Sequence, residues 1–79
     1  MTIKLSKRIV VETLIHYAQK HNEYKNKRIE DMRLTYEFKF DTIVNLLKAN
    51  GIDVKVNLRY VGSEFDFVSF EISGEYYDC

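Results

Sequence analysis

The placement of turn-forming residues constrains the fold of this chain more than any other feature. The 79 residues contain no proline, and the three glycines, Gly51, Gly62 and Gly74, all lie in the last third. Glycine and proline are the strongest local breakers of helices and strands. The sequence before Gly51 therefore favours long helices, and the sequence after it favours short segments joined by tight turns.

Residues 6–24 predict an amphipathic helix. Ser6 can act as its N-cap, because a serine hydroxyl accepts a hydrogen bond from the first helical turn. At 100° per residue one face collects apolar and aromatic side chains, namely Val10, Leu14, Tyr17, Ala18, His21 and Tyr24. The polar stretch at residues 21–27 predicts the turn to the next element.

Residues 27–50 permit two interpretations. Apolar residues at steps of three and four predict one long helix, with Ile29, Met32, Tyr36, Phe40, Ile43 and Leu47 on its inner face. Residues 34–40 also alternate strictly, as a half-buried strand would. The absence of glycine and proline favours the helix, in which Leu34 and Phe38 would form a second apolar edge. That edge would need cover from the sheet or from another chain.

The C-terminal third predicts a β-hairpin. Gly51 follows Asn50 at the position where a helix commonly ends in a left-handed residue. Alternating apolar residues then predict a strand at 54–60, and a strand at 64–72 returns after it. Gly62 and Ser63 suit the two-residue turn between these strands.

The pairing of the two strands predicts a β-bulge at Val68–Ser69. Unbroken pairing would place Val56 beside Ser69 and Val54 beside Glu71, which mixes apolar with polar side chains. One extra residue at the bulge instead pairs Val56 with Phe70, Val54 with Ile72, Arg59 with Asp66 and Lys55 with Glu71.

These elements predict a single α+β domain over residues 1–79, with element order α-α-β-β. A two-helix hairpin would pack on the C-terminal antiparallel β-hairpin; if 34–40 were a strand, the order would be α-β-α-β-β. Residues 1–5 and 74–79 are expected to be loose ends, although 74–79 could also continue the sheet briefly. Both edges of a lone hairpin would stay open to pairing with another strand.

The charge of the chain is neutral overall but unevenly distributed. Residues 1–33 carry eight Lys and Arg against four Asp and Glu, and residues 34–79 carry four against eight. The last twenty residues hold five acidic side chains, no basic one, and six of the eleven Phe and Tyr. This end predicts a protein-binding surface of Glu64, Asp66, Glu71, Glu75, Tyr76 and Tyr77.

The sequence contains no motif for a catalytic nucleophile, a phosphate-binding loop or a metal site. Glu12 and His16 supply only two of the three or four ligands that a metal needs. Cys79 is the only cysteine, so it forms no disulfide within the chain and suits a reducing compartment. We therefore expect a cytoplasmic protein without enzymatic activity, cofactor or metal. No apolar run is long enough for a membrane span or a secretory signal.

The expected function is a small non-enzymatic protein-binding module that self-associates or docks on a larger protein. The proline-free composition, rich in Lys, Asn, Ile and Tyr, resembles that of small accessory proteins of phages and mobile elements. This resemblance implies an inhibitor that blocks a site on a host protein such as a nucleic-acid-handling factor. One alternative is a nucleic-acid-binding protein that uses Lys25, Lys27, Arg28 and Arg33. Another is a homodimeric structural unit.

Overall fold

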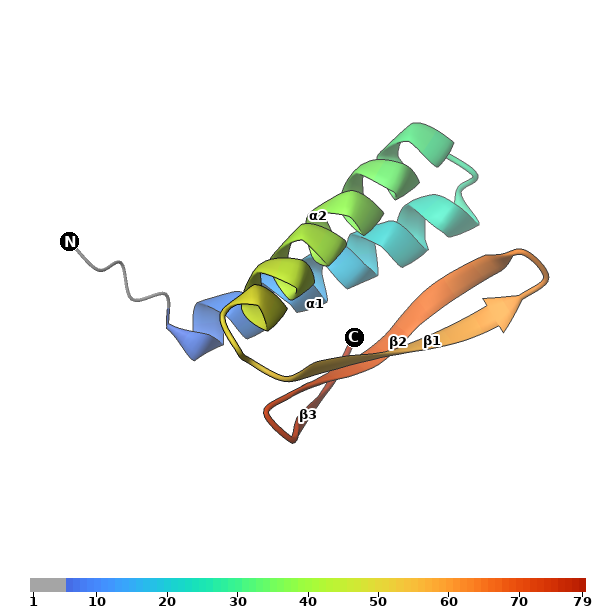
Figure 1. Ribbon diagram of the computed structural model, residues 1–79. Helices are drawn as coiled ribbons and strands as arrows, with labels where there is room; N and C mark the ends of the chain where they lie inside the picture. The colour runs from blue at the N-terminus through green and yellow to red at the C-terminus, as the bar shows by residue number, and fades with distance from the viewer. Residues whose placement is uncertain (1–5) are drawn as a thin grey trace.

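The computed structural model describes residues 6–79. Two helices precede three strands, in the order α1 (Lys7–Asn26), α2 (Glu30–Ala49), β1 (Val54–Val61), β2 (Glu64–Ile72) and β3 (Glu75–Asp78). The helices form a hairpin that packs on one face of an antiparallel sheet with strand order β1-β2-β3 (Figure 1). The predicted α+β class is confirmed, and the sheet has one strand more than the predicted hairpin.

Helix α1 begins at the predicted N-cap and ends later than predicted. The Ser6 hydroxyl accepts a hydrogen bond from the Ile9 N–H at 3.2 Å. The helix continues to Asn26, so the prediction of a turn at residues 21–27 is wrong. Three of the polar residues in this stretch, His21, Asn22 and Lys25, have partners on β2, as described below. The turn between the helices is formed instead by residues 27–29.

Helix α2 is continuous, so the alternative of a strand at residues 34–40 is wrong. In a strand Phe38 and Phe40 would share one face. In the helix they separate: Phe40 is fully buried, whereas Phe38 is 73% exposed. Gly51 ends the helix as predicted, with φ +79° and the Ile52 N–H donating to the Leu47 carbonyl at 3.0 Å.

The predicted β-bulge is confirmed. Leu58 faces Phe67 and Asn57 faces Ser69, which leaves Val68 as the extra residue of β2. The predicted partners follow from this register, with Val56 opposite Phe70, Val54 opposite Ile72, Arg59 opposite Asp66 and Lys55 opposite Glu71.

The expectation of a loose end at residues 74–79 is corrected by β3, which pairs antiparallel with β2. Ser73 and Gly74 both have positive φ, +51° and +85°, as a tight hairpin turn of primed type requires. The Tyr77 ring stacks on Phe70 with centroids 5.5 Å apart. These contacts give four residues enough packing to order as a strand. The expectation for residues 1–5 lies outside the described residues.

The core lies between the helix hairpin and the sheet. Its buried apolar side chains come from both layers and are Val11, Leu14, Ala18, Phe40, Val44, Val54, Phe67, Phe70 and Ile72. The Phe40 ring lies 4.2 Å from Phe67 and 6.1 Å from Phe70, centroid to centroid, and so joins α2 to β2. Neither helix within residues 6–79 has the length and apolar character needed to cross a membrane.

The two helices cover different strands. Helix α1 lies on the β2–β3 side, because Asn22 bonds to Phe67 of β2 and Lys7 pairs with Glu75 of β3. Helix α2 lies on the β1 side of the hairpin and contacts that strand. The outer flank of α2 and the outer edge of β1 therefore belong to the same side of the molecule.

Candidate interaction surfaces

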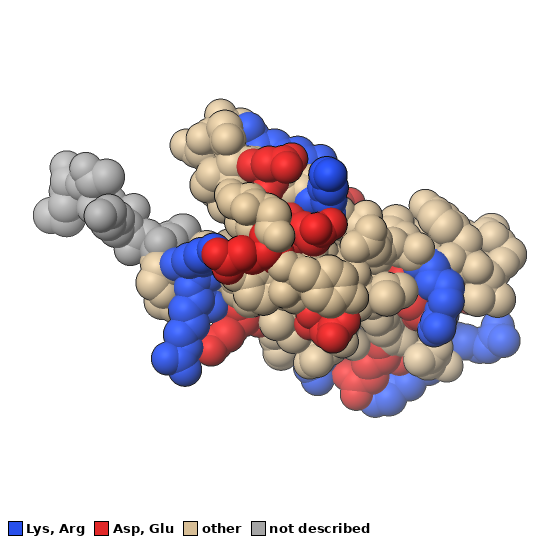
Figure 2. Space-filling view, turned by 90° about the horizontal axis from the view of Figure 1, so that it is seen from below, with Lys and Arg blue, Asp and Glu red and all other residues tan. Residues whose placement is uncertain are grey.

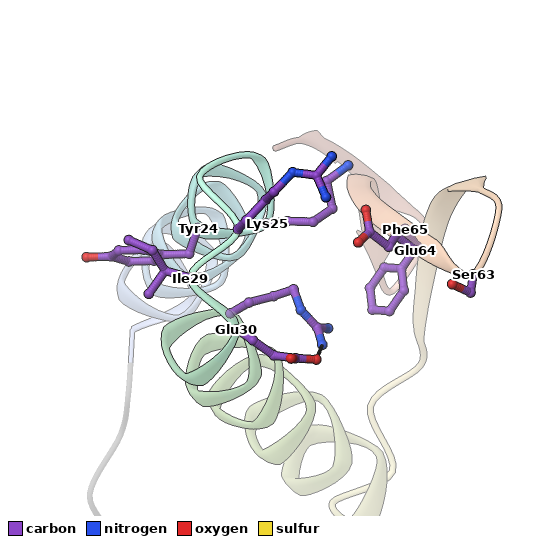
Figure 3. Close-up of a pocket in the computed structure, with 9 residues that line it drawn as sticks. Tyr24, Lys25, Ile29, Glu30, Ser63, Glu64 and Phe65 are labelled. Atoms are coloured by element: carbon purple, nitrogen blue, oxygen red, sulfur yellow. Dashed lines mark hydrogen bonds and ion pairs between the residues drawn. The ribbon is translucent and has the colours of Figure 1, made fainter.

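A cleft of about 320 Å³ opens at the end of the molecule where the turn between the helices meets the β1–β2 turn (Figure 3). Lys25, Arg28 and Arg33 line it together with Glu30 and Glu64. The fold thus brings three of the four predicted nucleic-acid-binding residues next to one residue of the predicted acidic surface. Figure 3 shows Lys25 and Glu64 entering the cleft from opposite walls.

The basic cluster is largely neutralised by internal ion pairs. Three of its four side chains have carboxylate partners: Lys25 with Asp66 at 2.8 Å, Arg33 with Glu30 at 3.2 Å and Lys27 with Glu23 at 3.4 Å. Only Arg28 has no ion pair within residues 6–79, and it is exposed in a left-handed conformation with φ +59°. Binding a phosphate backbone needs several cations on one face that are free to contact it. This cleft does not present them.

Asp66 is held by two cations from different elements. Lys25 of α1 and Arg59 of β1 lie 2.8 Å and 3.4 Å from its two carboxylate oxygens. The side chains of Lys25 and Asp66 are only 10% and 16% exposed. The close ammonium group of Lys25 is the main reason that the pKa of Asp66 lies below its ordinary value, against an opposing effect of burial. Asp66 therefore joins the end of α1 to the hairpin and is not free for a partner.

Replacing Asp66 with asparagine is expected to lower the free energy of unfolding by about 1–3 kcal/mol at pH 7, because the Lys25 ammonium loses its charged partner. The folded-state pKa is lowered from 3.8, so this stabilisation is present above pH 3.8 and is lost as the pH falls through the folded-state value. Urea unfolding at several pH values should show that the free energies of unfolding of the wild type and the variant become equal in acid.

The control for this experiment is Glu12→Gln. It removes the pair between Arg8 and Glu12, whose side chains are 86% and 63% exposed, and should cost less than about 0.5 kcal/mol. Equal stabilities of the wild type and Asp66→Asn at pH 7 would show that the Lys25 pair contributes nothing.

The predicted acidic surface is divided between the two ends of the sheet. Glu64 and Asp66 lie near the β1–β2 turn, whereas Glu71, Glu75, Tyr76 and Tyr77 lie near the β2–β3 turn. Glu75 is also occupied within the chain: Lys7 lies 2.8 Å from it, and the Tyr77 hydroxyl donates to it at 2.7 Å. The Lys7 hydrogen bond is the largest cause of the lowered pKa of Glu75.

Tyr76 and Glu71 lie side by side on the other face of the strands, and Tyr76 is 58% exposed. Figure 2 shows acidic and basic side chains interspersed on the side of the molecule that lies below the sheet in Figure 1. The uneven charge of the sequence does not become a patch of one sign there.

The outer face of α2 is apolar at its centre. Leu34 and Phe38 are 46% and 73% exposed, whereas Leu46, which is 57% exposed, lines a groove with Lys7 and Val10 of α1. Tyr36 contacts α1 and Phe40 contacts β2, and Phe38 lies about 200° from each around the helix axis. Phe38 therefore points away from both neighbours. The predicted second apolar edge of Leu34 and Phe38 is confirmed, and the sheet does not cover it.

On the side of the sheet opposite to β1, helix α1 closes the part of β2 that the short edge strand β3 leaves uncovered. Strand β3 covers β2 from Ser69 to Ile72. Beyond it, the Asn22 side chain donates to the Phe67 carbonyl and accepts from the Phe67 N–H, both at 2.9 Å. Asn22 thus supplies the two hydrogen bonds that a strand would supply, and blocks pairing with another chain here.

The opposite edge of the sheet, the outer edge of β1, has no strand partner within residues 6–79. Tyr60 and Val61 at its end are 66% and 65% exposed. We call this edge, together with the outer face of α2, the α2–β1 side; its exposed apolar residues are Leu34, Phe38, Tyr60 and Val61.

His21 and Asn22 both have structural roles. The sequence predicted His21 on an apolar helix face and Asn22 in a turn. His21 is fully buried and stacks on Phe65, with ring centroids 4.9 Å apart. Its Nδ1 lies 3.0 Å from the Asn22 carboxamide oxygen, which also accepts from Phe67, so Nδ1 carries the hydrogen. Nothing in the local sequence signals the Asn22–Phe67 contact, because the two residues are 45 positions apart.

Residues 6–79 contain no group of three or more His, Cys, Asp or Glu placed to hold a metal ion. The Cys79 thiol is half-buried, and burial raises its pKa to about 11, so it is protonated at neutral pH.

Comparisons of the chain with protein-family models, curated proteins and solved structures found no match.

Proposed function

We propose that this protein is a protein-binding module that acts by surface contact, and that it binds through the α2–β1 side. The observation that supports this most is Phe38, which is 73% exposed in the middle of a continuous helix and points directly away from the core. Leu34 precedes it by one helical turn on the same face.

An exposed aromatic residue at the centre of an apolar patch is typical of a binding surface. Large aromatic side chains contribute most of the binding energy at many interfaces, and apolar patches on small proteins commonly mark contact sites. Around Phe38, Thr35, Thr42 and Asn45 are uncharged and exposed. Asp41, one helical turn after Phe38, is also exposed, and a partner that covers this face must pair or desolvate its carboxylate.

The edge of β1 adds backbone hydrogen bonds to this surface. An unpaired strand edge offers a row of N–H and C=O groups that another strand can bind. The edge of β1 would supply directional backbone hydrogen bonds, and the outer face of α2 would supply apolar area. Blocking a site on a larger protein, as the inhibitor expected from the sequence would do, is one form of such binding. Nucleic-acid binding is not favoured, because three of the four basic residues are in ion pairs.

Capture experiments with a Phe38→Glu variant test this proposal. A tagged wild-type chain, expressed in its native cell together with an untagged copy, should retain a specific polypeptide that Phe38→Glu loses. Gln19→Glu is the matched control, because it adds the same charge on the exposed face of α1 and should retain the polypeptide. Equal capture by Phe38→Glu, with circular dichroism showing the same fold, would remove the α2–β1 side as the binding surface.

A further inference from the structure

We infer that the polypeptide bound by the α2–β1 side is a second copy of this chain, with the β1 strands of the two copies paired antiparallel across a two-fold axis. This inference rests on the proposed function and names its partner. The two three-stranded sheets would then form one continuous sheet of about six strands, a usual size for a sheet. A two-fold dimer of this kind buries the same surface on both copies.

The sequence of β1 is complementary to itself in a register centred on Leu58. A two-fold axis perpendicular to the sheet keeps each side chain on its own face, so a residue on the helix side meets another on the helix side. With the axis at Leu58, Leu58 meets its own copy and Val56 meets the partner subunit's Tyr60. On the other face Asn57 meets the partner subunit's Arg59. All pairs on the helix side are apolar, and no like charges are opposed.

The neighbouring registers are less favourable. With the axis at Asn57, Lys55 would lie opposite the partner subunit's Arg59, and with the axis at Arg59, the two copies of Arg59 would meet. Like charges directly opposite each other destabilise an antiparallel pair. The charges on β1 therefore exclude these two registers. The registers centred on Leu58 and on Val56 oppose no like charges, and the one centred on Leu58 is longer because it pairs residues 55–61 rather than 54–58.

The helix layer fits the same axis. Leu47 and Ile72 line one groove, and Ile72 pairs with Val54, so the end of α2 is level with the start of β1. Leu58 lies four residues along β1 from Val54, about 13 Å, which corresponds to about nine residues of helix. Nine residues before Leu47 is Phe38. The most exposed apolar side chain of the helix is thus level with the proposed axis.

The size and charge of the surface predict a weak but specific dimer. Helix α2 is about 30 Å long, and the helix and sheet layers together give a strip roughly 20 Å high, or about 600 Å² per copy. This is at the lower end of stable interfaces, which favours micromolar affinity. The chain has no net charge to oppose association, and a domain of 79 residues commonly needs such additional burial.

Sedimentation equilibrium of the purified chain from about 1 to 100 µM tests the inference. The mass should rise toward twice the 9.4 kDa of one chain. Asn57→Arg places a cation opposite the partner subunit's Arg59 at two symmetric positions, and should raise the dissociation constant about tenfold. Ser63→Arg adds the same charge in the β1–β2 turn, outside the paired segment, and should leave the constant unchanged.

A second variant decides the outcome if Asn57→Arg impairs folding. Asn57→Asp should tighten the dimer several-fold, by pairing with the partner subunit's Arg59, and the gain should diminish with salt. A dimer whose constant neither substitution changes would overturn the β1 register. A chain that stays monomeric at 100 µM would overturn the inference, while Phe38-dependent capture of a different protein would still support the proposed function.

Discussion

Phe40→Ala is expected to lower the free energy of unfolding by about 3–5 kcal/mol. The Phe40 ring is fully buried and contacts Phe67 and Phe70, so its removal leaves a cavity at the place where α2 meets the sheet. A domain of 79 residues has a total stability of about 4–12 kcal/mol. The loss is therefore large enough to unfold a substantial fraction of the protein, and urea titration followed by circular dichroism would measure it.

Phe38→Ala is the matched control, because it removes the same side chain from the same helix. Phe38 is 73% exposed, so at concentrations where the chain is monomeric the substitution should change stability by less than about 0.5 kcal/mol. The contrast between the two phenylalanines tests the helical assignment of residues 34–40. Similar losses for both variants would mean that Phe38 is buried within the chain.

Asn22→Ala is expected to cost about 2–3 kcal/mol. The substitution removes two hydrogen bonds, both 2.9 Å long, and leaves the N–H and C=O of Phe67 without partners at a partly buried strand edge. Urea unfolding would show the loss. Asn26→Ala, in the last turn of the same helix, is exposed and should be close to neutral.

The same Asn22 variant should also reopen the sheet edge. Amide exchange at Phe67 should quicken in Asn22→Ala, because its N–H loses its acceptor. Unchanged exchange at Phe67, together with unchanged stability, would show that Asn22 does not close this edge.

The features predicted correctly from the sequence are those that depend on neighbouring residues or on a direct pairing of two strands. The bulge at Val68 could be predicted because the unbroken register sets Val56 and Val54 against polar side chains. The helix at residues 30–49 could be predicted because no turn residue interrupts it. Gly51 signalled its end for the same local reason.

The features that the sequence left open or missed depend on contacts between distant segments; residues 74–79 were expected to be a loose end, with a short continuation of the sheet as the alternative. Strand β3 is only four residues long, and its order comes from Tyr77 stacking on Phe70 and from Lys7 pairing with Glu75. The Ser73–Gly74 dipeptide was the one signal that could have indicated its turn.

The candidate site was predicted only in part. Leu34 and Phe38 could be identified as an apolar edge, because helical periodicity alone places them off the inner face. The acidic set could not be assessed from the sequence, because only the fold reveals that Asp66 is bound to Lys25 and Glu75 to Lys7. Acidic residues that are close together in the sequence therefore need not form an acidic patch on the surface.

Hydrogen–deuterium exchange of the bound and unbound protein tests the central claim most directly. If the α2–β1 side is the contact surface, amides on the outer edge of Val54–Val61 should exchange more slowly when the partner is bound, whether that partner is a second copy or another protein. Protection confined to Lys7–Asn26 or Glu75–Asp78, with β1 unchanged, would contradict it.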